Sequence, residues 1–303
     1  AHHGNREDSA AVGRLFMSTS VSTSFVRQYE AEVKHLFQRE GGILRPAVRV
    51  VTGVVGESTT FQKIGKGVAV VKARHADITP MNADHTAVVC TLVDRFAGDF
   101  VDQFDQLKLK HDERDAITKA GVWACGRAVD NDLLIEFDNT TQTAVSFTGL
   151  SSQILARNAL ITVAKGLDAL EVPNDGQRYA VLTANAYAIA ETVDRFASAD
   201  YVDAMGRPMV TGAPFPNWRN FMGIKWTNHQ GIVGAGTATA KGYAWHKNAI
   251  GYALGAEITA DVTWQGTKQS FWIVNKFSGG AKLIDDTGAL ELTIVDTDAL
   301  PTS

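Results

Sequence analysis

Cysteine is almost absent from this sequence. The 303 residues include two, Cys90 and Cys125, which form no C-x-x-C pattern. Their spacing argues against a disulfide framework and a cysteine-rich zinc site, and it is typical of folding in a reducing cytoplasm. Long apolar runs are also missing: none reaches the roughly 18 residues of a membrane span, and the first residues lack the apolar segment of a signal peptide. We therefore expect a protein that is neither membrane-bound nor exported.

An excess of positive charge is missing too. Lys and Arg total 29 against 33 Asp and Glu, which gives a formal net charge of -4. A dedicated nucleic-acid binder usually carries a basic face, so we expect at most contact with DNA that is not sequence-specific. The 45% hydrophobic and 20% charged content is that of a globular chain with a core, in one large or two ordinary domains.

Catalytic and metal-binding motifs are lacking as well. The histidines form no H-E-x-x-H or H-x-H pair. The glycine-rich run 231–236 lacks the lysine and serine of a phosphate loop, and the acidic run 130–138 lacks the calcium-loop glycine. We therefore predict no catalytic residue, cofactor or metal ligand. One enzyme alternative stays open, a hydrolase that uses His229 and His246 if their strands are adjacent.

The stretch 43–92 is rich in Val, Thr and Gly and has no helical period. Strands at Val48–Val55 and Val68–Val71, with a polar tip at Ser58–Gly67, predict a long two-stranded arm. A lone hairpin is marginal in water, and no helix follows to cover this one. We expect a neighbouring copy of the chain to cover it, on an acidic patch because the arm is locally basic. The candidate contact residues are Val54, Val55, Phe61, Lys63, Ile64, Lys66, Val68, Lys72 and Arg74.

Two helices are expected in the first half of the chain besides a short one at 99–107. Apolar residues at helical spacing predict an amphipathic helix over 25–39, which packs on its own domain or on a neighbour. Asp112 begins a much longer helix that ends near Phe137. At about 1.5 Å per residue, its 25 or so residues span nearly 40 Å, so this helix is expected to serve as a spine.

From residue 151 onward, helical and strand patterns alternate, which indicates a compact α/β unit. A helix is expected to begin near Ser151, a buried strand lies at 179–183, and a short helix is expected at 249–254. A period of two from Ile258 to Trp264, a turn at 265–268 and a last strand at 290–294 follow. We expect these late strands to pair beside the long helix, which makes the first region discontinuous.

Several segments carry a family likeness. MSTSVSTSFVRQYEAEV, TFQKIGKGVAVVKARH, ITPMN, FASADYVDAMGRPMV, YAWHKNAIGYA and LIDDTGALE resemble the major capsid proteins of tailed bacteriophages, over residues 17–301. The resemblance implies an α+β fold of the Hong Kong 97 type, in which an extended β arm is called the E-loop. It implies an N-terminal arm and helix (1–42), the E-loop (43–90), a discontinuous peripheral domain with the spine helix (91–150 and 256–303) and an α/β axial domain (151–255).

The resemblance also implies a function. The chain would be a structural protein of the virion that assembles in the bacterial host cytoplasm, as hexamers and pentamers of an icosahedral shell around double-stranded DNA. Scaffolding, portal and decoration proteins would be its other partners. A decoration or tail-tube protein remains the structural alternative, since such proteins share β-rich arms and self-assembly.

Overall fold

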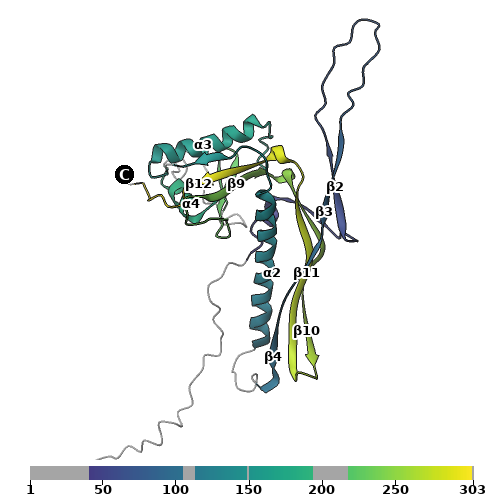
Figure 1. Ribbon diagram of the computed structural model, residues 1–303, viewed down its shortest axis with the longest axis vertical. Coiled ribbons are helices and arrows are strands. Elements are labelled where there is room, and N and C mark those ends of the chain that lie inside the picture. Colours follow the sequence, from purple (N-terminus) through teal and green to yellow (C-terminus); the bar gives the residue numbers. More distant parts are fainter. Residues whose placement is uncertain (1–40, 105–112, 149, 194–217, 302–303) are drawn as a thin grey trace, which may run out of the picture.

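The structure is a computed structural model, and it describes residues 41–104, 113–148, 150–193 and 218–301. These residues form two separate sheet units, a long helix beside one of them, and a projecting arm (Figure 1). The expected amphipathic helix at 25–39 lies outside the described residues. No helix in the described part of the chain combines the length and apolarity that crossing a bilayer requires.

The first unit is a four-stranded sheet in the order β1-β10-β11-β4. Its strands are β1 (Arg49–Thr52), β4 (Val93–Asp102), β10 (Ile250–Gln265) and β11 (Ser270–Leu283). The long helix α2 (Glu113–Phe137) lies along one face of β11 and β4 (Figure 1). On the opposite face, the described part of the chain covers only the end of the sheet on which the arm packs. Gly121 of α2 lies directly against the Asn275 side chain of β11, so a Cβ at this position would overlap the Asn275 amide and one of the two would have to move.

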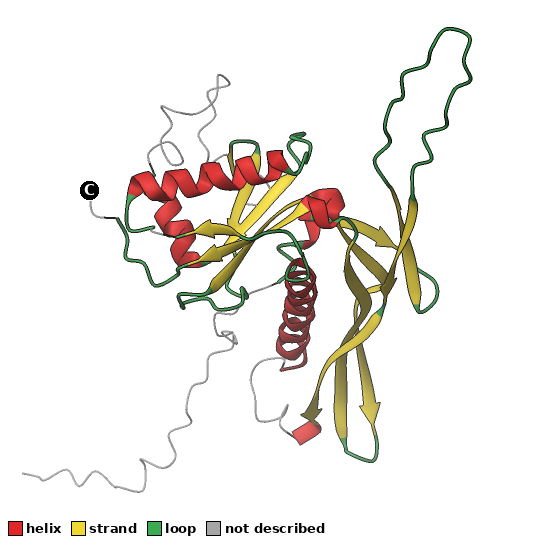
Figure 2. Cartoon of the chain, turned by 45° about the horizontal axis from the view of Figure 1, so that its top comes forward, coloured by secondary structure: helices red, strands yellow, loops and turns green. Residues whose placement is uncertain are grey.

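The second unit is a six-stranded sheet in the order β5-β12-β9-β6-β8-β7. Helices α3 (Gln153–Ala169) and α4 (Ala184–Glu191) cover one of its faces (Figure 2). The buried core between them includes Leu160, Trp226 and Leu292. The strands are β5 (Val145–Phe147), β6 (Arg178–Leu182), β7 (Arg219–Phe221), β8 (Ile224–Asn228), β9 (Ala240–His246) and β12 (Ala289–Ile294).

A two-stranded sheet forms the arm. Strand β2 (Ser58–Ile64) pairs antiparallel with β3 (His85–Thr91), and residues 65–84 form the loop between them. The structure therefore has a two-stranded arm as predicted, but the strands and the tip lie at other residues than expected. Residues 58–64 are a strand rather than the tip, and residues 68–71 lie in the loop. The strand β1 pairs parallel with β10 and is not part of the arm. The positive-φ glycines Gly53 and Gly56 turn the chain between β1 and the arm.

The long helix, the helix near residue 151 and the late hairpin match the sequence prediction. Three expectations are wrong. Residues 99–102 of the expected helix at 99–107 belong to β4, whereas 103–104 are helical and 105–107 lie outside the described residues. Residues 250–254 begin β10. The last strand, β12, pairs with β9 and β5 in the six-stranded sheet, and not with strands beside α2.

A buried carboxylate joins the two units. Asp130 of α2 accepts hydrogen bonds from the backbone N–H of Leu44 (3.1 Å) and lies 3.3 Å from Nε2 of His229, which follows β8. The Nδ1 atom of His229 accepts a hydrogen bond from the N–H of Gly231 (3.1 Å), so Nε2 carries the hydrogen and donates to Asp130. The acidic run 130–138, which the sequence analysis rejected as a calcium site, thus contributes a structural contact between α2, the N-terminal segment and the six-stranded sheet.

Candidate assembly surface

The arm comprises β2, β3 and the loop 65–84, and its root packs on its own subunit. Phe61 of β2 lies on Gly251, and Thr91 at the end of β3 lies on Gly280, where a Cβ at either glycine would overlap the arm. Phe61 is only 3% exposed and shares a small buried cluster with Cys90. The expectation that Phe61 contacts a neighbouring copy is therefore wrong, because the chain's own sheet covers it.

Two lysines of the arm are tied to the body. Lys63 Nζ forms an ion pair with Asp285 Oδ1 at 2.6 Å, and Lys66 forms one with Glu171. Burial opposes the ionisation of Asp285, but hydrogen bonds from Lys63 and Thr287 outweigh it and lower the pKa of Asp285. These two lysines therefore hold the arm on its own subunit in this structure.

Beyond this root, the arm leaves its apolar side chains uncovered. Ile64 is 64% exposed and Val71 is 96% exposed. Monomeric proteins rarely expose a contiguous set of this kind, which marks an interaction surface. The exposed apolar residues of the arm and of its approach from β1 are Val55, Ile64, Val68, Val70, Val71, Ile78, Met81 and Val89.

The other predicted contact residues differ in exposure. Val54 is half-buried against the cluster at the root of the arm. Lys72 and Arg74 are exposed in the loop, and within the described part of the chain they form no ion pair. Their charge is therefore not neutralised within the described residues, and their contact with a neighbouring copy stays a prediction.

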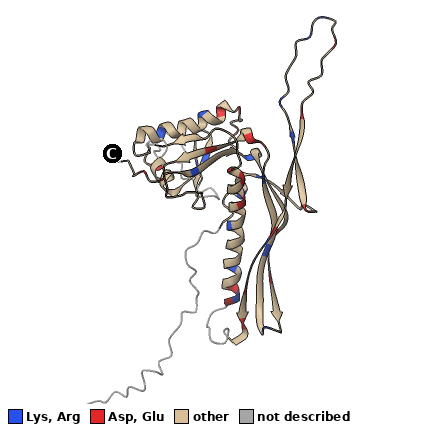
Figure 3. Cartoon of the chain, viewed as in Figure 1, with Lys and Arg blue, Asp and Glu red and all other residues tan. Residues whose placement is uncertain are grey.

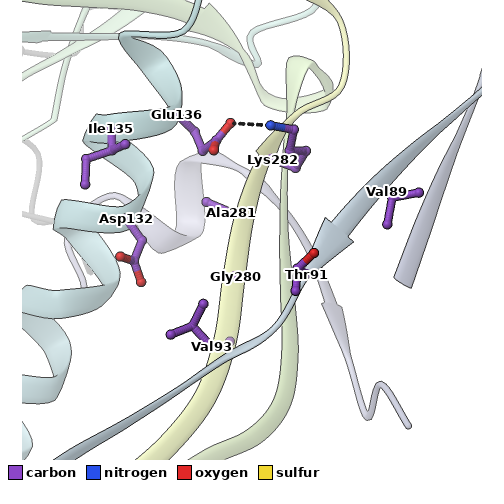
Figure 4. A pocket seen from close by; sticks show the side chains of 10 residues that line it. Val89, Thr91, Val93, Asp132, Ile135, Glu136, Gly280, Ala281 and Lys282 are labelled. Atoms are coloured by element: carbon purple, nitrogen blue, oxygen red, sulfur yellow. Dashed lines mark ion pairs between the residues drawn. The ribbon is translucent and has the colours of Figure 1, made fainter. Parts of the chain in front are cut away.

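A cleft of about 320 Å³ opens where the chain passes from the arm to β4. Figure 4 shows that α2 lines one side with Asp132, Ile135 and Glu136, while Val89 and Val93 come from β3 and β4. Ile135 is 61% exposed, so the mouth of the cleft continues the apolar surface of the arm. Ile135 was not among the contact residues that the sequence analysis predicted.

The charges inside the cleft are paired within the subunit. Arg95 forms an ion pair with Asp132, and Lys282 Nζ lies 3.5 Å from Glu136 Oε2 (Figure 4). Desolvation raises the pKa of Asp132 although Arg95 acts against it. Along α2, acidic positions gather at both ends with basic ones between them (Figure 3). The cleft therefore presents a neutral, partly apolar surface.

Exposed aromatic residues form a second surface that the sequence analysis did not identify. On the face of the four-stranded sheet away from α2, the ring of Phe100 lies against that of Trp272, with centroids 4.3 Å apart and ring planes tilted by 40°. The ammonium of Lys268 lies 3.8 Å from the centroid of Phe100. Phe96, four residues before Phe100 on the same strand, is also exposed. The strand-like alternation of side chains along residues 93–102 was the sequence signal for this surface, but the helix expected at 99–107 obscured it.

The two histidines of the hydrolase alternative do not meet. His246 is in register with Arg178, the first residue of β6, whereas His229 follows Asn228, which is in register with the last residue of β6. They lie at opposite ends of a five-residue strand, roughly 13 Å apart along it. Each is buried and hydrogen-bonded to a carboxylate, His229 to Asp130 and His246 to Asp175.

No group of three metal-ligating side chains occurs among the described residues. A closed α/β unit beside an uncovered apolar arm defines a class of protein: a structural subunit that is completed by association with further subunits.

Comparison with known proteins gives this class a family. A model of the phage capsid protein family matches residues 21–295, and the chain belongs to this family. No curated protein matches the chain in sequence.

Solved structures agree on the fold. The capsid of the cyanophage P-SCSP1u is 16% identical with a TM-score of 0.70, covering 91% of this chain and 94% of that one. A chain of Mycobacterium phage Che8 is 17% identical (TM-score 0.69; 91% and 98% covered), and the capsid of Ralstonia phage GP4 is 12% identical (TM-score 0.67; 98% and 100% covered). The predicted α+β capsid fold of the Hong Kong 97 type is confirmed.

The protein is thus a major capsid protein, a structural component of the virion that forms the shell from oligomeric capsomers. The family favours this function over a decoration or tail-tube protein.

Proposed function

We propose that this chain builds the hexameric and pentameric capsomers of an icosahedral shell, which encloses the double-stranded DNA of a tailed bacteriophage. Assembly takes place in the cytoplasm of the bacterial host, with scaffolding, portal and decoration proteins as further partners. The observation that carries the proposal is the set of exposed apolar residues of the arm beyond its root, which the rest of the described chain leaves uncovered. The family assignment supplies the kind of assembly.

A neighbouring copy covers the arm in the proposed shell. Burying one Val or Ile side chain is worth about 1.5–3 kcal/mol. Half of the eight exposed apolar residues would therefore contribute on the order of 10 kcal/mol, comparable with the roughly 4–15 kcal/mol that association costs. Lys72 and Arg74 add attraction to acidic groups on the neighbour.

The proposed contact with DNA is weak and not sequence-specific. Tight binding to DNA requires several lysine or arginine contacts to phosphates, each of which releases counterions. A subunit with a net charge of -4 is suited to confining DNA without gripping it. The shell interior therefore needs no dedicated DNA-binding site on this chain.

Electron microscopy of the purified full-length protein at rising concentration tests the proposal. We expect shells or capsomer rings, and a protein that stays monomeric in every condition would overturn it. Ile64→Asp places a charge on the arm and should abolish particles. Asn158→Asp adds the same charge on the exposed side of α3, away from the arm, and should leave assembly unchanged.

A further inference from the structure

The arm is fastened to both sheet units, by different kinds of contact. Its root packs apolar groups on β10 and β11 of the four-stranded sheet, through Phe61 and Cys90. Its outer part is held only by charges. Lys63 pairs with Asp285 in the link between β11 and β12, and Lys66 pairs with Glu171, two residues after the end of α3. The apolar root therefore belongs to the four-stranded sheet, Lys63 is held at the link between the two sheets, and Lys66 is held at the six-stranded unit.

The outer ion pair spans an open cleft. A space of about 270 Å³ lies between Lys66, Glu171, His246 and Thr287. The Lys66 and Glu171 side chains are 75% and 70% exposed, so no apolar packing supports them. Only the charges fix the arm at this point, and an ion pair of this kind can open and close reversibly.

The backbone at Glu171 is a second, independent observation. Its φ is +58°, in the left-handed region that follows many helices and that glycine occupies most easily. A residue with a side chain is strained in this backbone conformation, and the carboxylate of that side chain forms the ion pair with Lys66. Strained positions that persist mark candidate functional contacts.

We propose that Lys63 and Lys66 form an ionic latch, which couples the angle of the arm to the six-stranded sheet and uses the Phe61 root as its pivot. The proposal rests on the proposed function, in which the arm is presented to the next copy. With the latch closed, the arm keeps the direction seen in Figures 1 and 2. With the latch open, the arm turns about its root. Because an exposed ion pair shifts an equilibrium by at most a few-fold, the latch is easily opened.

Distance measurements by electron spin resonance on the unassembled full-length chain test the latch. Spin labels are placed at His85→Cys, the outermost paired residue of β3, and at Lys165→Cys on α3. The native cysteines are buried and should not take up label. We expect one narrow distance distribution, which broadens in Lys66→Glu and in Glu171→Lys. The double exchange Lys66→Glu with Glu171→Lys should restore the narrow distribution.

Controls separate the latch from a general effect of charge. Lys72→Glu makes the same change in the loop, away from the ion pairs, and should leave the distribution narrow. Raising salt from about 0.1 M to about 1 M shortens the electrostatic screening length from about 10 Å to about 3 Å, and it should therefore broaden the distance distribution of the wild type. An unchanged distribution in Lys66→Glu, or a double exchange that fails to restore it, would overturn the latch. Shell formation is scored separately by electron microscopy, so the latch can fail while the capsid function stands.

Discussion

The six-stranded sheet and the arm are both β structures with large apolar side chains, but they differ in what covers those side chains. In the sheet, α3 and α4 of the same chain cover Trp226 and Leu292 completely. In the arm, Val71 stays 96% exposed. The comparison teaches that burial within the chain makes the subunit fold, whereas apolar groups left outside make it assemble.

Trp226→Ala tests the completed side of this comparison and should have the largest effect. The indole is fully buried in the core under α3 and α4. Its loss leaves a cavity and should lower the free energy of unfolding by about 3–5 kcal/mol. Urea denaturation followed by circular dichroism measures the change. A loss below about 1 kcal/mol would show that this core contributes little to the fold.

Asp130→Ala tests the joint between the two units. It removes the acceptor for His229 and for the N–H of Leu44, and leaves these buried groups unpaired. We expect a loss of about 3–5 kcal/mol in the free energy of unfolding, as for other broken buried pairs. The isosteric Asp130→Asn keeps one acceptor and should lose less. Equal losses in the two variants would contradict the role given to the hydrogen bonds.

Gly280→Val tests the root of the arm. A Cβ at this position overlaps the carbonyl of Thr91, so the arm must lift from β11. We expect a loss of about 1–3 kcal/mol, typical of overpacking, and faster proteolysis in the loop 65–84 while the sheet units stay folded. Gly266→Val, in the turn between β10 and β11, where a Cβ would meet no atom closer than 4.0 Å, serves as a control for proteolysis at the arm. Unchanged cleavage of the arm in Gly280→Val would contradict this packing.

Acid should weaken the contacts between the segment that follows α2 and the link to β12. Burial opposes ionisation of Asp286, but hydrogen bonds from Thr141, Gln142 and Thr140 outweigh it and lower the pKa of Asp286. A lowered pKa means that this stabilisation is present above the unfolded value of about 3.9 and is lost as pH falls through the folded pKa. The temperature at the midpoint of thermal unfolding should therefore fall as the pH is lowered below about 4, and it should fall less steeply in Asp286→Asn. Identical pH profiles in the wild type and the variant would contradict this role of Asp286.

Val71→Asp should have the smallest effect on the isolated subunit. An exposed position of this kind changes the free energy of unfolding by about 0.5 kcal/mol or less. The same variant should nevertheless assemble poorly, since it buries a charge in the contact between copies. Light scattering of matched wild-type and variant samples measures this. Normal assembly kinetics would place Val71 outside the contact.

The elements with local signals could be predicted from the sequence. The long helix was expected at Asp112–Phe137 and is observed at Glu113–Phe137, because capping and helix-forming residues lie within the segment itself. The turn between β10 and β11 was likewise expected from its neighbours in sequence.

The features that depend on distant residues could not be predicted. The burial of Phe61 is set by Gly251, which lies 190 positions later and has no side chain. The apolar run at 68–71 favours a strand by propensity alone, but no strand is aligned with it, since β2 and β3 already pair at 58–64 and 85–91. Strand propensity reports fit to a partner surface, and the partner was not visible in the sequence.

Hydrogen exchange of residues 65–91 in the free subunit and in the assembled shell tests the central claim most directly. The account predicts fast exchange in the loop 65–84 of the free subunit and strong protection there after assembly, while α3 and β6 are protected in both states. Equally fast exchange of the loop in both states would show that no second copy covers the arm, and it would contradict the account.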